Sequence, residues 1–315
     1  MYTAGSQAAL HVCEIYTSIM GESTYAGWPA IIVRLAGCPL RCTWCDSPHA
    51  YRNGEEVPLG EILQRIETGG LRLVLLTGGE PLAQAGSRHL VSQLLRLGYK
   101  VVIESGGGVS IQGVDPRACI VLDIKCPTSG MQDRQVWENL DCLKPEDEVK
   151  FVIASRGDYE WARDFLRRTD LAERQVVHFS PVEPGWEERQ ADGEREAHAE
   201  RKTHGDREAG GERKADGKRE ADAERKPDGE LGADGQHEAP GRAGEQSTDE
   251  LKPRAPASEA GGGGGDRGGL RLAVPTQPPG VTRRALAEWI LADRLPVRLN
   301  LQLHAWIWGA GTRGV

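Results

Sequence analysis

The stretch GCPLRCTWCDS, residues 37–47, contains the cysteines Cys38, Cys42 and Cys45. Their spacing, Cys-x3-Cys-x2-Cys, places three soft thiolate ligands in one tight loop. A [4Fe–4S] cluster prefers cysteine sulfur, and three protein ligands leave one of its irons open to a small molecule. A structural zinc loop is the alternative interpretation, but zinc closes a tetrahedral shell and needs a fourth ligand. The spacing therefore favours a cluster with one open iron.

Composition restricts the class of protein. The chain has 315 residues, 38% of them hydrophobic, and a formal net charge of −8. This mild acidity argues against direct binding of nucleic acid, which needs a basic surface. No run approaches the roughly 20 apolar residues of a membrane span. The first residues, MYTAGSQAALHVCEIYT, lack the features of a secretory signal. Seven cysteines, an odd number, fit a reducing cytoplasm better than a disulfide framework.

Residues 187–269 differ in composition from the rest of the chain. Imperfect repeats of Glu-Arg, Ala-Asp-Gly and Arg-Glu units are followed by a Pro/Ala/Gly segment that ends in glycine runs. Such a segment buries too little apolar surface to offset the entropy of ordering. We expect residues 187–269 to be a disordered insertion, with residues 1–186 and 270–315 forming one core domain.

The rest of the chain alternates apolar runs with amphipathic segments. The predicted strands are Ala30–Leu35, Leu71–Leu76, Lys100–Glu104, Ile120–Ile124, Glu148–Ile153, Gln175–Phe179 and Arg298–Leu303. The predicted helices are Leu59–Glu67, Ala85–Leu97, Gln132–Leu143, Asp158–Arg168 and Thr282–Ala292. Apolar strands separated by helices indicate an α/β fold with a parallel sheet. Because ligands bind at the carboxyl ends of such strands, the unusual loops that follow them should share one rim.

The segment Thr77-Gly78-Gly79-Glu80-Pro81 follows the second predicted strand. Together with the three-cysteine loop it resembles the radical SAM superfamily, whose members cleave S-adenosylmethionine (SAM). The resemblance implies a partial (β/α)6 barrel. Glycines at 78 and 79 would let the backbone approach the SAM amino group without Cβ obstruction. Glu80 could accept a hydrogen bond from that ammonium or fix the turn.

Three further stretches narrow the resemblance. They are EIYTSIMGESTYAGWPAIIVRLAGC (14–38), CDSPHAY (45–51) and RLNLQLHAWIWGAGTRGV (298–315). They are similar to the 7-carboxy-7-deazaguanine synthase family, a lyase family of queuosine biosynthesis. The resemblance implies a SAM- and Mg²⁺-dependent radical ring contraction of 6-carboxy-5,6,7,8-tetrahydropterin to 7-carboxy-7-carbaguanine, with release of ammonia. It also implies a homodimer and a reductant such as flavodoxin or ferredoxin.

The resemblance assigns roles to particular residues. Cys38, Cys42 and Cys45 would hold the cluster, and the Ser47 hydroxyl, a hard oxygen ligand, would bind Mg²⁺. The residues expected to bind SAM are Gly79, Glu80, Ser105, Lys125, Phe179, Ser180, Pro181 and Val182. The residues expected to bind the pterin are Ile19, Met20, Gly21, Glu22, Arg34, Thr77, Gln302 and His304. Asp46 is expected to orient the loop.

Structural roles remain open for several of these residues. Glu22 could be a loop carboxylate in water, Arg34 a structural ion pair, and Lys125 a partner of Asp123. Gln302 and His304, expected on the last strand, could be buried polar residues whose hydrogen bonds are all made within the core.

The chain departs from the common family pattern at three positions. It has Met20 where the family has glutamine, Ser47 where it has threonine, and Ala305 where it has lysine. The changes at 47 and 305 put the magnesium affinity and any cationic role at residue 305 in doubt.

Two other functions share some of these features. An activating protein for glycyl-radical enzymes has the same three-cysteine spacing and acts on a protein partner. A zinc-binding adaptor would use the loop as a structural site and the charged segment for docking.

Overall fold

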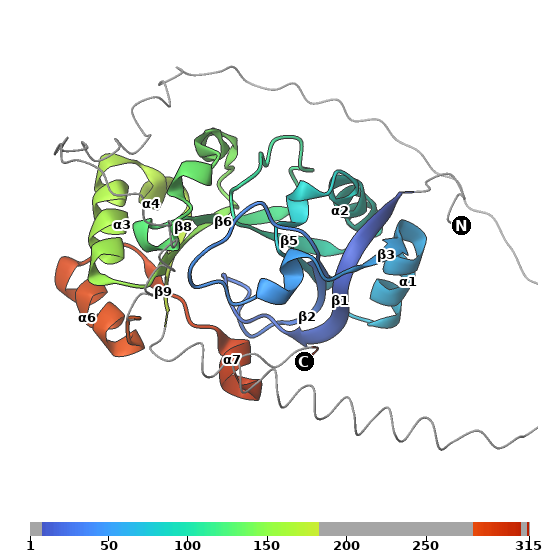
Figure 1. Cartoon of the computed structure of the whole chain (residues 1–315), viewed down its shortest axis with the longest axis horizontal. Coiled ribbons are helices and arrows are strands. Elements are labelled where there is room, and N and C mark those ends of the chain that lie inside the picture. Colours follow the sequence, from blue (N-terminus) through green and yellow to red (C-terminus); the bar gives the residue numbers. More distant parts are fainter. Residues whose placement is uncertain (1–7, 183–279, 310–313, 315) are drawn as a thin grey trace, which may run out of the picture.

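The computed structural model describes residues 8–182, 280–309 and 314. Nine strands form one sheet in the order β3-β1-β2-β4-β5-β6-β7-β8-β9 (Figure 1). They are β1 Ala9–Ile19, β2 Pro29–Leu35, β3 Glu55–Pro58, β4 Leu73–Gly78, β5 Lys100–Ser105, β6 Cys119–Ile124, β7 Glu148–Ile153, β8 Val176–Pro181 and β9 Arg298–Leu299. From β2 to β9 all neighbouring strands are parallel. The predicted α/β class with a parallel sheet is confirmed.

Helices cover the outer face of this sheet. Figure 1 shows α1 (Leu59–Thr68) and α2 (Gly86–Arg96) at one end of the molecule, and α3 (Arg156–Arg168) and α6 (Arg283–Asp293) at the other. A short helix, α4 (Leu171–Arg174), precedes β8. Apolar side chains of the strands and helices form one main core cluster between the two layers. A smaller apolar cluster, which includes Ile32, Leu75 and Val102, lies on the inner side of the sheet, where polar groups are also found.

Strand β7 shows how the sequence divides the two faces. Val149, Phe151 and Ile153 belong to the main core, whereas Glu148 and Lys150 alternate with them. Successive side chains of a strand point to opposite faces. The charged residues of β7 therefore lie on the inner face of the curved sheet.

The structure corrects three predictions of secondary structure. Strands β1 and β3 were not predicted, and both run antiparallel to their neighbours. The segment predicted as the helix Gln132–Leu143 instead contains two 3-10 turns, Gln132–Arg134 and Trp137–Cys142. The predicted strand Arg298–Leu303 is wrong beyond Leu299, because residues 303–308 form the helix α7 (Leu303–Trp308). The predicted insertion, 187–269, lies outside the described residues.

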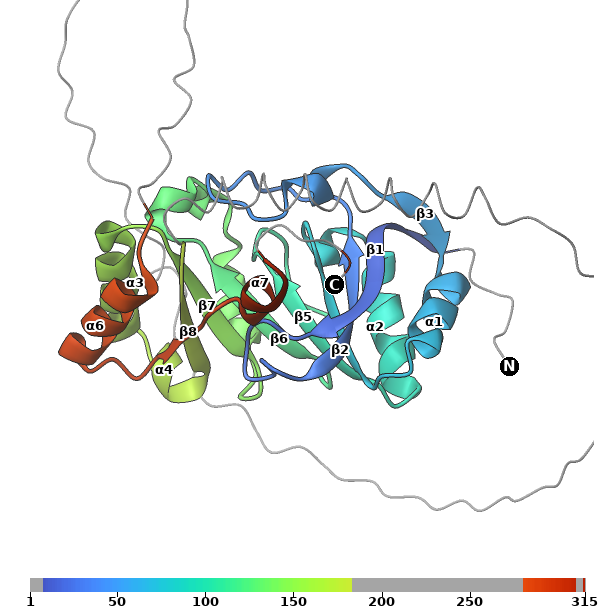
Figure 2. The ribbon, with the colours of Figure 1, turned by 90° about the horizontal axis from the view of Figure 1, so that it is seen from below.

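Helix α7 connects the end of the described chain to its beginning. The Leu303 amide donates to the Gly21 carbonyl oxygen at 3.0 Å, so α7 is attached to the turn between β1 and β2. Figure 2 shows α7 in front of the middle of the sheet. Among the described helices, each is too short or too polar to cross a bilayer.

Candidate active site

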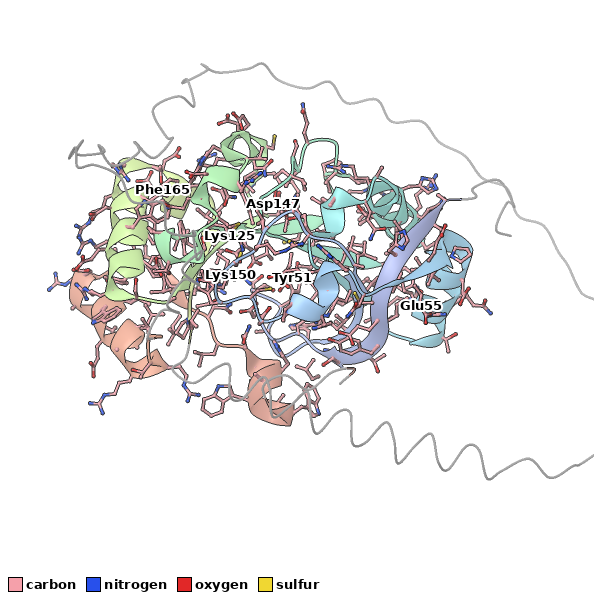
Figure 3. The ribbon with its side chains drawn as sticks, viewed as in Figure 1. Tyr51, Glu55, Lys125, Asp147, Lys150 and Phe165 are labelled. Carbon is pink, nitrogen blue, oxygen red and sulfur yellow. The ribbon has the colours of Figure 1, made fainter. Side chains whose placement is uncertain are left out.

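A cavity of about 660 Å³ lies on the inner side of the sheet. Residues from β1, β2, β4, β5, β6, β7 and β8 line it, together with the cysteine loop and α7. Its volume lies within the range of small-molecule sites. Figure 3 places Lys125, Lys150 and Tyr51 near the middle of the molecule, between the two groups of helices. The cysteine loop, the glycine turn after β4 and the segments after β5 and β6 all line this cavity. The prediction that the loops after the strands lie at one edge of the sheet is therefore confirmed.

Cys38, Cys42 and Cys45 all line this cavity, and none forms a disulfide. Their loop is held against the segment after β6, because the Thr43 hydroxyl donates to the Thr128 carbonyl oxygen at 2.6 Å. Burial raises the pKa of each thiol, that of Cys45 to about 11 with a further contribution from Asp46. The thiols are therefore protonated at neutral pH and must release protons when they bind iron.

The three cysteines fit a cluster better than a single metal ion. Structural zinc closes a tetrahedral shell of four protein ligands, and this loop supplies three cysteines. A [4Fe–4S] cluster instead separates its cysteine ligands around four irons. The donor set and its spacing agree with the cluster.

Gly78 and Gly79 form a turn that packs against the cysteine loop. Gly78 has φ +134°, and a Cβ there would lie 2.1 Å from the Leu35 carbonyl oxygen. A Cβ at Gly79 would lie 2.4 Å from the Gly37 carbonyl oxygen. Any larger residue would push the turn away from the end of β2. The glycines therefore allow the turn after β4 to contact the loop that holds the cysteines.

Glu80 fixes this turn, which is one of the two roles considered from the sequence. Its carboxylate accepts hydrogen bonds from the amides of Leu82 (3.2 Å) and Gly106 (2.9 Å) and from the Ser105 hydroxyl (3.1 Å). Burial raises the pKa of Glu80 to about 7, although these hydrogen bonds oppose the change. Glu80 is completely buried. It thus joins the glycine turn to the loop after β5.

The other residues expected near SAM lie in different surroundings. Lys125 lines the cavity and forms an ion pair with Asp123 at 3.0 Å. This ion pair is the structural alternative that was considered from the sequence. Ser180, Pro181 and Val182 also line the cavity. Phe179 does not, which corrects its predicted position. Its ring lies in the main core, 5.5 Å from the ring of Phe151 between centroids.

Glu22 is buried, so the interpretation as a loop carboxylate in water is wrong. Its carboxylate accepts from Lys150 Nζ at 2.9 Å and from Asn300 Nδ2 at 3.3 Å. Asn300 also donates to the Ser180 hydroxyl at 3.0 Å. The four polar residues Glu22, Lys150, Asn300 and Ser180 all line the cavity and form one connected group.

Ile19 and Gly21, on either side of Met20, line the cavity, whereas Met20 does not. The Met20 side chain is fully buried in a smaller core cluster with Ile32 and Leu75. Its amide donates to the Trp28 carbonyl oxygen and its own carbonyl accepts from Gly27. Both backbone groups are therefore used by the turn, and the Met20 side chain does not reach the cavity.

Arg34 reaches the cavity from the end of β2. Its Nε donates to Glu14 at 2.7 Å, and its two terminal nitrogens lie 3.3 Å from the hydroxyls of Ser47 and Tyr16. The ion pair expected as the alternative role is thus present, and the guanidinium still lines the cavity. Nearby, the Thr77 hydroxyl donates to Glu104 at 3.0 Å.

Gln302 and His304 line the cavity from α7 and not from the last strand. Gln302 Nε2 donates to Asp46 at 2.9 Å, and Asp46 also accepts from Ser47 at 3.1 Å. A Cβ at Gly21 would lie 1.8 Å from His304 Nδ1. The glycine therefore makes room for the histidine. The alternative of core polar residues is wrong for both side chains, because they face the cavity.

The polar cavity residues missed from the sequence include Glu14, Tyr16, Glu104, Lys150 and Asn300. For two of them a signal was present, because Glu104 and Lys150 interrupt the otherwise apolar strands VVIES and EVKFVI. A charged residue within such a strand indicates that one face of the sheet is not packed against apolar groups.

This chain is similar to a known superfamily and to a solved structure. The model of the radical SAM superfamily matches residues 32–122, which run from β2 to β6 and include the cysteine loop and the glycine turn. A solved structure, QueE from Escherichia coli, is similar over 55% of this chain and 84% of that chain. Its sequence identity is 22% and its TM-score is 0.46.

Curated relatives identify the family more narrowly. The 7-carboxy-7-deazaguanine synthase of Koribacter versatilis (strain Ellin345) is 45% identical over 180 residues, which are 55% of this chain and 78% of the relative. The 7-carboxy-7-deazaguanine synthase of Chlorobaculum tepidum is 29% identical over 313 residues, or 98% of this chain and 99% of the relative. Since both relatives carry one name and the superfamily model covers the cysteine loop, this chain belongs to the 7-carboxy-7-deazaguanine synthase family.

Proposed function

We propose that the chain converts 6-carboxy-5,6,7,8-tetrahydropterin to 7-carboxy-7-carbaguanine and ammonia by a SAM-dependent radical ring contraction. The observation that carries the proposal is the single cavity that joins the three cysteines to two polar groups. One group contains Glu22, and the other contains Arg34. Cys38, Cys42 and Cys45 would hold a [4Fe–4S] cluster, which would supply the electron for reductive cleavage of SAM. The protein's share is to bind, orient and exclude water.

The polar groups suit the two ends of a carboxypterin. Glu22 is an acceptor that can take N–H bonds from the amino-pyrimidine edge, and the hydrogen bond from Lys150 at 2.9 Å orients its carboxylate. Arg34 presents a guanidinium on the same cavity wall for the substrate carboxylate. His304 and Gln302 would close the cavity from α7.

SAM would lie between the cysteines and the carboxyl ends of β5, β6 and β8. Lys125 offers a cation to its carboxylate, although Asp123 already neutralises part of that charge. Ser180, Pro181 and Val182 would line the adenine side. Ser105 is already bonded to Glu80, so we expect it to act through the turn.

Magnesium is proposed at Ser47. Its hydroxyl lies 3.1 Å from an Asp46 carboxylate oxygen, and both residues line the cavity. The attraction of Lys150 and Arg34 outweighs burial and lowers the pKa of Asp46. Mg²⁺ prefers hard oxygen ligands and usually keeps several waters. One hydroxyl can therefore suffice when the substrate carboxylate completes the shell.

The proposal extends to partners and location. We expect flavodoxin or ferredoxin as the reductant, a homodimer, and a cytoplasmic protein that contacts no nucleic acid directly. The family resemblance supports the first two, and the odd number of cysteines supports a reducing compartment. Light scattering after size exclusion tests the dimer.

One experiment decides the reaction. The protein is reconstituted anaerobically with iron and sulfide, then incubated with reductant, SAM, Mg²⁺ and 6-carboxytetrahydropterin. Mass spectrometry should detect 7-carboxy-7-carbaguanine. A fully loaded cluster that cleaves SAM but leaves the pterin unchanged would contradict the substrate and not the superfamily. A parallel incubation with a glycyl-radical partner tests that alternative, and a colourless, zinc-loaded protein would instead support the adaptor.

A further inference from the structure

Tyr51 lies beside the cysteines but has no part in the binding of SAM or substrate described above. It ends the 3-10 turn Pro48–Tyr51, which follows the cysteine loop directly. Its side chain lines the same cavity as the three cysteines, and its hydroxyl forms a side-chain hydrogen bond with the sulfur of Cys45. Figure 3 shows Tyr51 near the centre of the molecule. The phenol is therefore a neighbour of one cluster ligand.

Two sets of contacts fix this phenol in place. The Arg41 guanidinium carbon lies 4.2 Å from the centre of the Tyr51 ring. Arg41 also donates to the carbonyl oxygens of Cys38 (2.7 Å) and Leu40 (2.6 Å), which ties it to the cysteine loop. On the other side, the carbonyl of Ala50 accepts from the Gly37 amide at 2.8 Å. Arg41, Tyr51 and the loop backbone thus form one rigid arrangement around the cysteines.

We propose that Tyr51 is a positioning residue that raises the reduction potential of the cluster by donating a hydrogen bond to Cys45. A phenol is protonated at neutral pH and can donate to a thiolate. Hydrogen bonds to the ligating sulfurs stabilise the more negative, reduced cluster and thereby make reduction easier. Arg41 acts in the same direction, because it adds a positive charge and holds the ring. The reduction potential of the cluster can be measured without the pterin, so this proposal can be tested even if the proposed substrate is wrong.

The test measures the midpoint potential of the reconstituted protein by anaerobic redox titration with electron paramagnetic resonance. Tyr51→Phe keeps the ring and its contact with Arg41 but removes the donor. We expect the midpoint to move to a more negative potential by about 59 mV, which is a tenfold lower ratio of reduced to oxidised cluster for one electron. Site-specific 3-fluorotyrosine at position 51, a stronger donor, should move the midpoint the opposite way.

Tyr99→Phe is the matched control. The Arg72 guanidinium carbon lies 5.2 Å from the centre of the Tyr99 ring, so this tyrosine also contacts an arginine. Tyr99 comes just before β5, at the end of the strand that is far from the cavity. Its midpoint should equal that of the unmodified protein. Unchanged midpoints for both Tyr51 replacements at full iron and sulfide content would overturn the proposal. An equal shift for Tyr99→Phe would also overturn it. If Tyr51→Phe fails to assemble its cluster, the fluorotyrosine shift decides alone.

Discussion

At the scale of single residues, the ion pair between Glu22 and Lys150 connects stability to binding. Both side chains are nearly buried, with exposed fractions of 8% and 12%, and their charged atoms lie 2.9 Å apart. Removing one partner of such a pair leaves an unpaired buried charge. We predict that Lys150→Met lowers the free energy of unfolding by about 3 kcal/mol, measured by urea titration.

A double variant separates the lost pair from the lost side chain. Glu22→Gln combined with Lys150→Met removes both charges of the pair and should recover part of that loss, because Glu22 is no longer left as a buried charge without its partner. Lys100→Met, at the exposed start of β5, is the matched control and should change the free energy of unfolding by less than about 0.5 kcal/mol. An additive double variant would show that the two residues do not interact.

Glu14 gives the site a dependence on pH. Burial acts to raise its pKa, but the contacts with His49 and Arg34 outweigh burial and lower the pKa from 4.5 to about 2. Because the folded-state pKa lies below the unfolded one, Glu14 stabilises the protein above pH 4.5. This stabilisation is lost as the pH falls from about 4.5 to about 2.

We predict that Glu14→Gln removes up to about 3 kcal/mol of unfolding free energy at neutral pH. The difference from the unmodified protein should shrink between pH 4.5 and pH 2. Urea titrations across this range measure it. Glu61→Gln, whose pair with Arg65 on α1 is half exposed, should show no comparable dependence. A Glu14→Gln difference that stays constant with pH would contradict the assignment.

The sequence predicted the parts of the site that are local and missed those that the fold assembles. Cys38, Cys42 and Cys45 share one loop, so their spacing alone indicates their chemistry. Asn300 and Glu22 are separated by 278 positions, and only the sheet brings them together. Met20 and Phe179 show the opposite error, because a residue beside a site in sequence can point into the core.

At the scale of elements, the apolar parallel strands were predicted because both of their faces are largely buried. Strand β1 was missed because its middle part, CEIYTS, contains several polar residues and is mostly half-buried, so it has no apolar run. The segment Leu303–Trp308 is rich in aromatic residues, which favour strands, yet it forms α7. Its attachment to the Gly21 carbonyl is a tertiary contact that no local pattern indicates.

The attachment of α7 gives a prediction at this scale. Gly21→Ala places a Cβ 1.8 Å from His304 Nδ1, so the imidazole must shift from its place beside the cavity. We predict at least a tenfold higher KM for the pterin, while SAM cleavage without pterin stays unchanged. Gly60→Ala is the control, because a Cβ there meets nothing within 4 Å. An unchanged KM for Gly21→Ala would show that His304 does not contact the substrate.

At the scale of the whole molecule, the curved sheet separates the main apolar core from the cavity. The main core lies between the outer face of the sheet and the helices, and it includes none of the three cluster cysteines. The inner face carries the cavity, and its charged residues Glu14, Arg34, Glu104, Asp123 and Lys150 come from strands that each contribute apolar residues to the core. The chain can therefore vary the cavity lining without rebuilding the core.

This separation predicts how the protein responds to loss of the cluster. The triple replacement of Cys38, Cys42 and Cys45 by alanine should abolish iron binding and SAM cleavage. It should still unfold in one cooperative transition, because the core is formed without the cysteine loop. Circular dichroism during heating measures the transition, and 5′-deoxyadenosine formation measures SAM cleavage. Replacing Cys119, Cys126 and Cys142 by alanine is the matched control, which should keep the brown cluster while losing stability at the two buried positions. A triple variant at the loop that shows no cooperative transition would mean that the cluster, and not the sheet alone, holds this fold together.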